Sequence, residues 1–282
     1  MIIDFHTHTF PDKVALKAID AMSLEAGIRH QTDGTVSGLA SSMRQHGIDL
    51  SLNLPVATRA DQVSKINENM IASQEDLRSM GIVTFGAMHP DCPDCRQQLR
   101  LLVDHGIRGI KLHPAYQNTD LNDIRMMRIL DAASELDLMV TIHAGLDIGI
   151  PHHDFASINM INEVIDAVHP TGFILAHMGN WGAWDRVESD LCGAPVWMDT
   201  AFALGPMDVR EDAHRLPDPD HNMDADQFVR IVRKHGADKI LFATDSPWER
   251  PAVYRNFIEE SQLTEDEKKL IFSENAKKIL RI

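Results

Sequence analysis

Two hydrophobic patterns alternate along the chain. Short apolar runs rich in β-branched residues recur, and longer stretches with apolar residues at helical spacing lie between them. The strand candidates are Ile2–His6, Leu50–Leu54, Val83–Ala87, Gly109–Leu112, Met139–His143, Phe173–Ala176, Pro195–Asp199 and Ile240–Ala243. This alternation is typical of βα units with a parallel sheet, and eight strands are the number that closes a (β/α)₈ barrel.

The stretches between the strands differ in length. Asp91–His105 and Asp123–Leu136 have apolar residues at helical spacing and predict helices. Pro11–His46 is long enough for one or two helices, and Leu204–Ala225 is interpreted either as a lid over the active site or as a surface decoration. No repeat or linker divides the chain, so residues 1–282 are predicted to form a single domain.

Composition narrows the class of protein. A length of 282 residues agrees with one α/β barrel, which needs about 250. The formal net charge of −15 argues against nucleic acid as a partner, because phosphate contacts need a basic surface. No apolar run reaches the ~20 residues of a membrane span, and the first eight residues lack the features of a secretory signal. We therefore expect a cytoplasmic enzyme that acts on a small molecule, without a membrane partner.

Several strand candidates end in a side chain that can bind a metal or titrate. His6 and His8 end the first strand, and because side chains alternate along a strand they share a face. Three later strands end in His143, His177 and Asp245. The carboxyl ends of barrel strands form the catalytic face, so these five side chains predict a site for a divalent metal ion.

The same alternation makes predictions for the rest of the first strand. Asp4 shares the face of His6 at a deeper position, which suits a residue that orients a ligand histidine. Ile3 and Phe5 are then predicted to point outward, onto the surrounding helices.

The fourth strand places two polar residues on one face. Lys111 and His113 are predicted to point into the barrel mouth, whereas Ile110 and Leu112 face the helices. Lys111 is interpreted as a binder of a substrate carboxylate, as a carbamate that bridges two metals, or as a salt-bridged strand lysine. Together with Trp248, which follows Asp245, both polar residues are predicted to contact the substrate.

At this point the order of motifs resembles a known family. The matching motifs are DFHTH (4–8), GIKLHP (109–114), IHAG (142–145), AHMG (176–179) and FATDSPW (242–248). In these motifs the chain resembles the amidohydrolase superfamily, in particular the amidohydrolase 2 branch that includes aminocarboxymuconate-semialdehyde decarboxylase and many metal-dependent hydrolases. The resemblance runs from the first residue to the C-terminus.

The resemblance implies a distorted (β/α)₈ barrel with one divalent ion, usually zinc. It assigns His6, His8, His143 and Asp245 as ligands and places His177 beside the metal-bound water. Three histidines and an aspartate also suit Mn²⁺, Fe²⁺ or Co²⁺. A homodimer is expected by the same analogy.

The main hypothesis for function is hydrolysis. A metal-activated water attacks the carbonyl carbon of an amide, lactone or ester-like bond, Asp245 accepts its proton, and His177 orients the water. The alternative is a non-oxidative decarboxylase of an unsaturated or aromatic carboxylate, in which His177 helps deliver a proton to the carbon that loses CO₂. Either reaction needs a cation for the carboxylate, and the candidates are Lys111, Arg186 and Arg250. A non-catalytic binding protein is disfavoured because no metal-capable position is missing.

Overall fold

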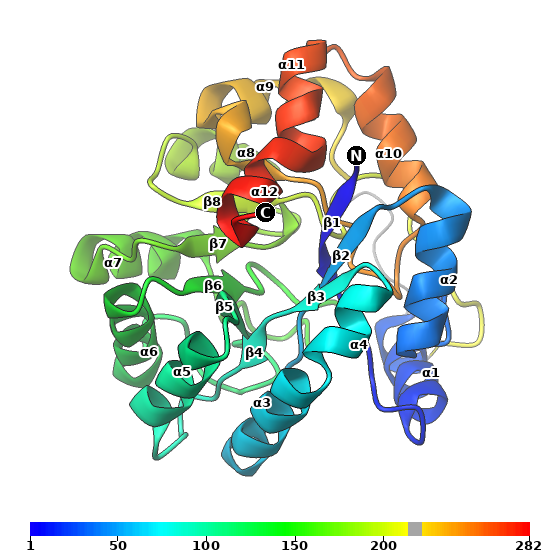
Figure 1. Ribbon diagram of the computed structural model, residues 1–282. Coiled ribbons are helices and arrows are strands. Elements are labelled where there is room, and N and C mark those ends of the chain that lie inside the picture. Colours follow the sequence, from blue (N-terminus) through cyan, green and yellow to red (C-terminus); the bar gives the residue numbers. More distant parts are fainter. Residues whose placement is uncertain (214–221) are drawn as a thin grey trace.

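Parallel strands form the centre of the molecule, as the alternating pattern predicts. The computed structural model of the protein describes residues 1–213 and 222–282. Its strands are β1 (Ile3–Thr7), β2 (Leu50–Asn53), β3 (Ile82–Thr84), β4 (Gly86–Ala87), β5 (Gly109–Leu112), β6 (Met139–Ile142), β7 (Phe173–Leu175), β8 (Trp197–Asp199) and β9 (Ile240–Leu241). They pair in chain order and in parallel, β1 to β3 in one sheet and β4 to β9 in another. Figure 1 shows these strands around a common centre, with helices on the outside.

The two sheets are joined by the chain itself on one side and by backbone hydrogen bonds on the other. The strands β3 and β4 occupy the place of one predicted strand and are separated by Phe85, whose N–H donates to the carbonyl of Asn53 at 3.1 Å. On the other side, the N–H of Phe5 in β1 donates to the carbonyl of Phe242, just after β9, at 2.8 Å. The prediction of an α/β barrel is therefore confirmed, with one strand interrupted.

Helices follow the strands and pack around them. The α-helices in the described residues are α1 (Ala15–Ala26), α2 (Val36–His46), α3 (Val63–Ala72), α4 (Gln74–Ser79), α5 (Cys95–Asp104), α6 (Ile124–Glu135), α7 (Ile158–Val168), α8 (Trp184–Arg186), α9 (Ala225–His235), α10 (Pro251–Glu260), α11 (Glu265–Lys269) and α12 (Asn275–Leu280). Short 3₁₀ or π segments are η1 (Ala60–Gln62), η2 (His177–Gly179), η3 (Val187–Leu191), η5 (Ala237–Lys239) and η6 (Leu270–Glu274). Helices α5 and α6 lie within the two stretches predicted to be helical. No helix in the described part of the chain is long and apolar enough to cross a membrane.

The two long connections meet. The first contains two helices, α1 and α2, and the second is described except for residues 214–221, so its interpretation as a lid falls partly outside the described residues. The N–H of Arg29, just after α1, donates to the carbonyl of Asp208 at 2.7 Å, and the N–H of Arg210 donates to Gly27 at 2.9 Å. These bonds tie the first part of the second connection to the end of α1.

The side-chain alternation of β1 is broken within the strand. Its register against β2 shifts between Asp4 and Thr7. Ile3 and Phe5 belong to a buried cluster that also contains side chains of β2 and β7, which are not neighbours in the sheet order. Phe5 packs edge to face on Phe85, with ring centroids 6.0 Å apart. The prediction that Ile3 and Phe5 face the outer helices is therefore wrong, because the irregularity turns them toward the barrel interior.

Candidate metal centre and active-site pocket

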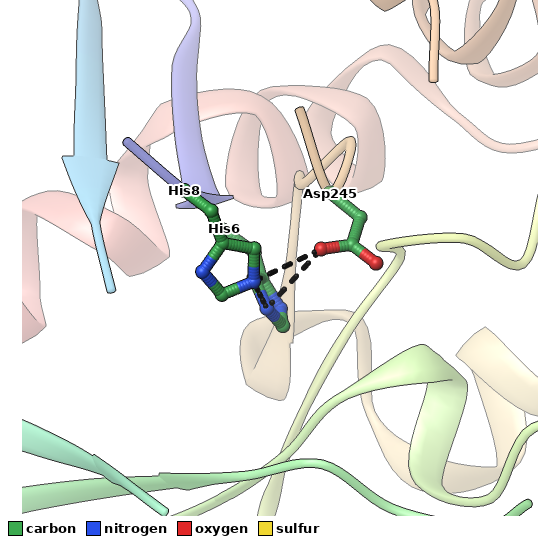
Figure 2. A group of neighbouring side chains, drawn as sticks. All are labelled: His6, His8 and Asp245. Carbon is green, nitrogen blue, oxygen red and sulfur yellow. Dashed lines mark hydrogen bonds and ion pairs between the residues drawn. The ribbon is translucent and has the colours of Figure 1, made fainter. Parts of the chain in front are cut away.

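Three predicted ligands converge at the mouth of the barrel. His6 and His8 come from the end of β1, and Asp245 comes from the segment after β9 (Figure 2). The Nε2 atoms of the two histidines are 3.1 Å apart, and Oδ1 of Asp245 lies 3.5 Å from Nε2 of His6 and 3.2 Å from Nε2 of His8. This oxygen is buried and has no hydrogen-bond partner. A divalent ion among these three atoms would satisfy it, so the group fits a metal ligand set.

Hydrogen bonds orient both histidines for metal binding. Nδ1 of His6 lies 2.8 Å from Oδ2 of Asp199, and Nδ1 of His8 lies 2.7 Å from the carbonyl of Leu54. Each acceptor requires the proton on Nδ1, so each Nε2 presents a lone pair toward the common point. Burial would raise the pKa of Asp245, but the neighbouring imidazoles of His6 and His8 hold it well below its usual range. The third ligand is therefore an ionised carboxylate.

The residue that orients His6 is Asp199 and not Asp4. Both oxygens of Asp4 accept hydrogen bonds from Thr244, at 3.0 Å from its N–H and at 2.6 Å from its hydroxyl. Asp199 is fully buried at the end of β8. The register shift in β1 removes Asp4 from the face of His6. A signal for Asp199 was present in the sequence, because it ends a predicted strand as the other site residues do.

His143 and His177 form a second part of the site. Nδ1 of His177 donates to the carbonyl of Ala201 at 2.9 Å, and Nε2 of His177 lies 2.9 Å from Nδ1 of His143. Both rings line the same pocket as His6, and the ring of His177 lies 5.5 Å from that of His6 between centroids. His143 thus contacts His177 and is not part of the group formed by His6, His8 and Asp245. Its role as a ligand remains a prediction.

A second site residue, besides Asp199, was not predicted from the sequence. Asp147 follows β6, and its Oδ2 lies 3.6 Å from Nε2 of His113 and 3.8 Å from Nε2 of His143. The N–H of Gly149 donates to Oδ1 at 2.8 Å. Burial raises the pKa of Asp147 to about 6. Side-chain alternation gives no information here, because Asp147 lies in a loop beyond the end of the strand.

Lys111 is the candidate cation that reaches the site. It is fully buried on β5, and its Nζ lies 3.2 Å from Nε2 of His6. Burial lowers the pKa of Lys111 to about 8, although nearby carboxylates oppose the shift. Arg186 and Arg250 instead pair with surface acids, Asp190 and Asp208. Of the three cations proposed for a substrate carboxylate, only Lys111 lines the pocket.

The pocket above these groups is mostly apolar. Its walls include Phe10, Met22, Ile28, Val56, Met70, Phe202 and Trp248. His113 and Trp248 both line it, as predicted for substrate contacts, and Tyr116 stacks on His113 with ring centroids 3.9 Å apart. Among the described lining residues Lys111 is the only lysine or arginine. The pocket therefore offers a polar floor and apolar walls to a small molecule.

A buried carboxyl next to the site makes stability depend on pH. Burial raises the pKa of Glu249 from 4.5 to about 8, and the charge of Asp245 adds to the shift. Between these values the folded state binds more protons than the unfolded state, so the free energy of unfolding falls as pH rises. Between pH 5 and pH 8 we expect the free energy of unfolding to decrease less in the Glu249→Gln variant than in the unmodified protein, by roughly a few kcal/mol. Urea unfolding of the metal-free unmodified protein and the metal-free variant at pH 5 and pH 8 measures this difference. An equal decrease in the free energy of unfolding in the two proteins would contradict the prediction.

Comparison with known proteins agrees with this geometry. A family model described as amidohydrolase matches residues 3–282, and the chain therefore belongs to the amidohydrolase family. No curated protein matches it in sequence.

The similar solved structures share the fold at low sequence identity. One is 5-carboxyvanillate decarboxylase LigW from Sphingomonas paucimobilis, at 13% identity and a TM-score of 0.70, covering 100% of this chain and 99% of the other. A second is 2,6-dihydroxybenzoate decarboxylase from Rhizobium, at 14% identity and 0.67, covering 99% and 98%. A third is a dihydroxybenzoic acid decarboxylase from Polaromonas sp. JS666 with bound manganese and the inhibitor 2-nitroresorcinol, at 14% and 0.69, covering 99% and 96%.

These neighbours correct the main hypothesis for function. The chain was predicted to be a hydrolase, with a decarboxylase as the alternative. The similar structures described above are decarboxylases of aromatic carboxylates, and the alternative fits them better. The reason for the error is that one ligand set serves both reactions, so the motifs identify the family without identifying the bond that is broken.

Proposed function

We propose that this protein is a metal-dependent decarboxylase that releases CO₂, without redox chemistry, from a small aromatic or unsaturated carboxylate. The observation that carries the proposal is the group of His6, His8 and Asp245 beside buried Lys111, at the floor of a mostly apolar pocket. A carboxylate is stabilised by the positive charges at the floor, and a planar apolar skeleton fits the walls. The substrates named for the similar structures, 5-carboxyvanillate and dihydroxybenzoate, have this chemistry.

We assign the metal ion to His6, His8, His143 and Asp245. The Nε2 lone pairs of the first two histidines and the unpartnered Oδ1 of Asp245 support the assignment. Zinc is the first ion to test, and manganese is the second because the Polaromonas structure contains it. When bound, the ion supplies positive charge that stabilises negative charge on the substrate oxygens.

His177 is assigned to proton delivery. The reaction breaks the bond between the skeleton carbon and the carboxylate carbon, and the electron pair stays on the skeleton carbon, which takes up one proton. Nδ1 of His177 is held by the carbonyl of Ala201, so Nε2 is the nitrogen that gives the proton. Burial lowers the pKa of His177, while the charges of Asp245 and Asp199 oppose the shift. Asp245 is thus proposed both as a ligand and as a charge that favours the protonated form of His177.

Lys111 is assigned to the substrate carboxylate. We expect Lys111→Met to weaken substrate binding by about tenfold to a hundredfold, because a hydrogen bond to a charged group is lost, with the metal content unchanged. Methionine keeps the length and the apolar packing of the buried stem. Steady-state kinetics and elemental analysis of the variant check both statements. Arg250→Met removes an exposed cation outside the pocket and serves as the control, and an unchanged KM in Lys111→Met would contradict the assignment.

Release of CO₂ tests the function directly. The protein loaded with Zn²⁺ or Mn²⁺ is incubated with hydroxybenzoates, dihydroxybenzoates and short unsaturated carboxylates, and CO₂ is measured together with the product. In D₂O the product is expected to carry one deuterium at the carbon that lost the carboxylate. Failure of every compound to release CO₂ from metal-loaded protein would refute the proposed reaction.

A further inference from the structure

The pocket above the proposed metal ligands is larger than a single aromatic ring requires. Its volume is about 280 Å³. An apolar cavity of about 150 Å³ is enough to bind benzene. One ring with its carboxylate near Lys111 therefore leaves a substantial part of the pocket unfilled, and this part is open to a further group of the substrate.

Beyond the strand ends the pocket is lined by two helices. Met22 and Ala26 of α1 are four residues apart, and Ile66 and Met70 of α3 have the same spacing. Residues at this spacing lie on one face of a helix, so each helix turns an apolar strip toward the pocket. Both helices lie along the lower edge of the molecule in Figure 1. We call these four half-buried side chains, together with Ile28 just after α1, the helical wall.

The helical wall offers no charged partner to a ligand. The charged residues among the described lining of the pocket are Lys111, Asp147 and Asp245, and all three come from strands or from the loops that follow them. Asn69, between the two wall residues of α3, is polar but neutral and is exposed to solvent. Burial of apolar atoms against this wall is favourable, whereas a charged group would lose water without gaining an ionic partner.

Contacts between distant segments hold the α1 side of the wall in place. Ile28 is 3% exposed and forms an antiparallel bridge with Val209. Two residues after the bridge, the N–H of Gln31 donates to the carbonyl of Pro247, in the loop after β9, at 2.6 Å. The wall is thus attached to the same loop that carries a proposed metal ligand. A surface that is already fixed binds a ligand with little loss of conformational entropy.

We infer that the substrate carries, beyond its carboxylate, an apolar extension about the size of a second ring, such as a short alkyl chain, and that the helical wall binds this extension. The inference rests on the proposed function for the position of the carboxylate at the floor of the pocket. It adds the size and the polarity of the part of the substrate that lies away from the carboxylate.

Binding tests the inference separately from turnover. Manganese-loaded protein is titrated calorimetrically with methylbenzoates and butylbenzoates, each as the three positional isomers, and with benzoate itself. We expect the best butylbenzoate to bind at least about tenfold more tightly than the methylbenzoate with the same substitution pattern, because three further methylene groups are removed from water.

One substitution tests the wall itself. Ala26→Leu places a larger side chain in the helical wall and is expected to reduce the preference for butyl over methyl to about twofold or less. Binding of benzoate should change by less than about twofold, because a single ring at the floor does not need the wall. Ala21→Leu is the matched control, since Ala21 also belongs to α1, is exposed and lies outside the pocket lining. It should keep the preference of the unmodified protein.

Each other outcome overturns the inference. Equal binding of the methyl and butyl compounds, or no binding by any compound, would refute it. A preference for butyl that persists in folded Ala26→Leu would show that the helical wall does not bind the extension. If Ala26→Leu does not fold, as judged by thermal unfolding, the ranking in the unmodified protein still decides. Binding that depends on alkyl length without CO₂ release from any carboxylate would refute the proposed reaction alone, whereas CO₂ release without this dependence would refute the inference alone.

Discussion

Asp245→Asn is expected to lower the rate of CO₂ release by roughly 10³-fold or more, in a chain that remains folded. The carboxylate of Asp245 is proposed to bind the ion and to support the proton on His177, and a neutral amide can do neither. Asparagine has the same shape and tolerates the left-handed backbone at this position, where φ is 63°. Initial rates at saturating metal, together with near-UV circular dichroism, measure the two parts of the expectation.

The control for this change is an aspartate far from the chemistry. Asp226→Asn removes an exposed carboxylate in the first turn of α9 and should leave the rate within about twofold of the unmodified protein. Asp245→Asn that keeps more than about a tenth of the activity would show that Asp245 is not essential, and the proposed mechanism would be wrong.

His6→Ala/His8→Ala is expected to lower the metal content from about one ion per chain to less than about a tenth. The change removes two of the proposed ligands, whose Nε2 atoms both present a lone pair toward Oδ1 of Asp245. Elemental analysis after loading and desalting measures the ion, and CO₂ release is expected to disappear with it.

A matched double variant tests whether removing any two neighbouring histidines lowers the metal content. His152 and His153 are exposed, adjacent and outside the pocket lining, so His152→Ala/His153→Ala should retain the ion. Retention of metal in His6→Ala/His8→Ala would place the ion elsewhere. Two ions per chain in the unmodified protein would contradict the single-ion assignment, and no ion under any loading condition would contradict the metal centre altogether.

The barrel and the meeting of its strand-end residues were predictable from local patterns. Apolar periodicity distinguishes strands from helices, and parallel strands bring their carboxyl ends to one face. For this reason Asp245 could be predicted to lie beside His6 and His8, although it is far from them in the sequence. The same argument predicted correctly that Lys111 and His113 face the pocket.

The errors arose where the chain departs from ideal geometry. The register shift in β1 is one residue in size, and it moves Asp4 to Thr244 and Phe5 to the interior. Strict alternation cannot anticipate such a shift, because it depends on how β1 fits β2 and the end of β9. Asp147 was missed for a related reason, since a loop residue has no period that indicates its direction.

The sequence by itself determined the α/β barrel, the family and the metal-capable residues, because these depend on short-range periodicity and on motifs at strand ends. The tertiary structure alone decided that Asp199 orients His6 and that Lys111 is the cation in the pocket. It also decided that Asp147 faces the pocket beside His113. These are contacts between segments distant in sequence, set by how the strands and loops pack, and the pattern of any one segment contains no record of them.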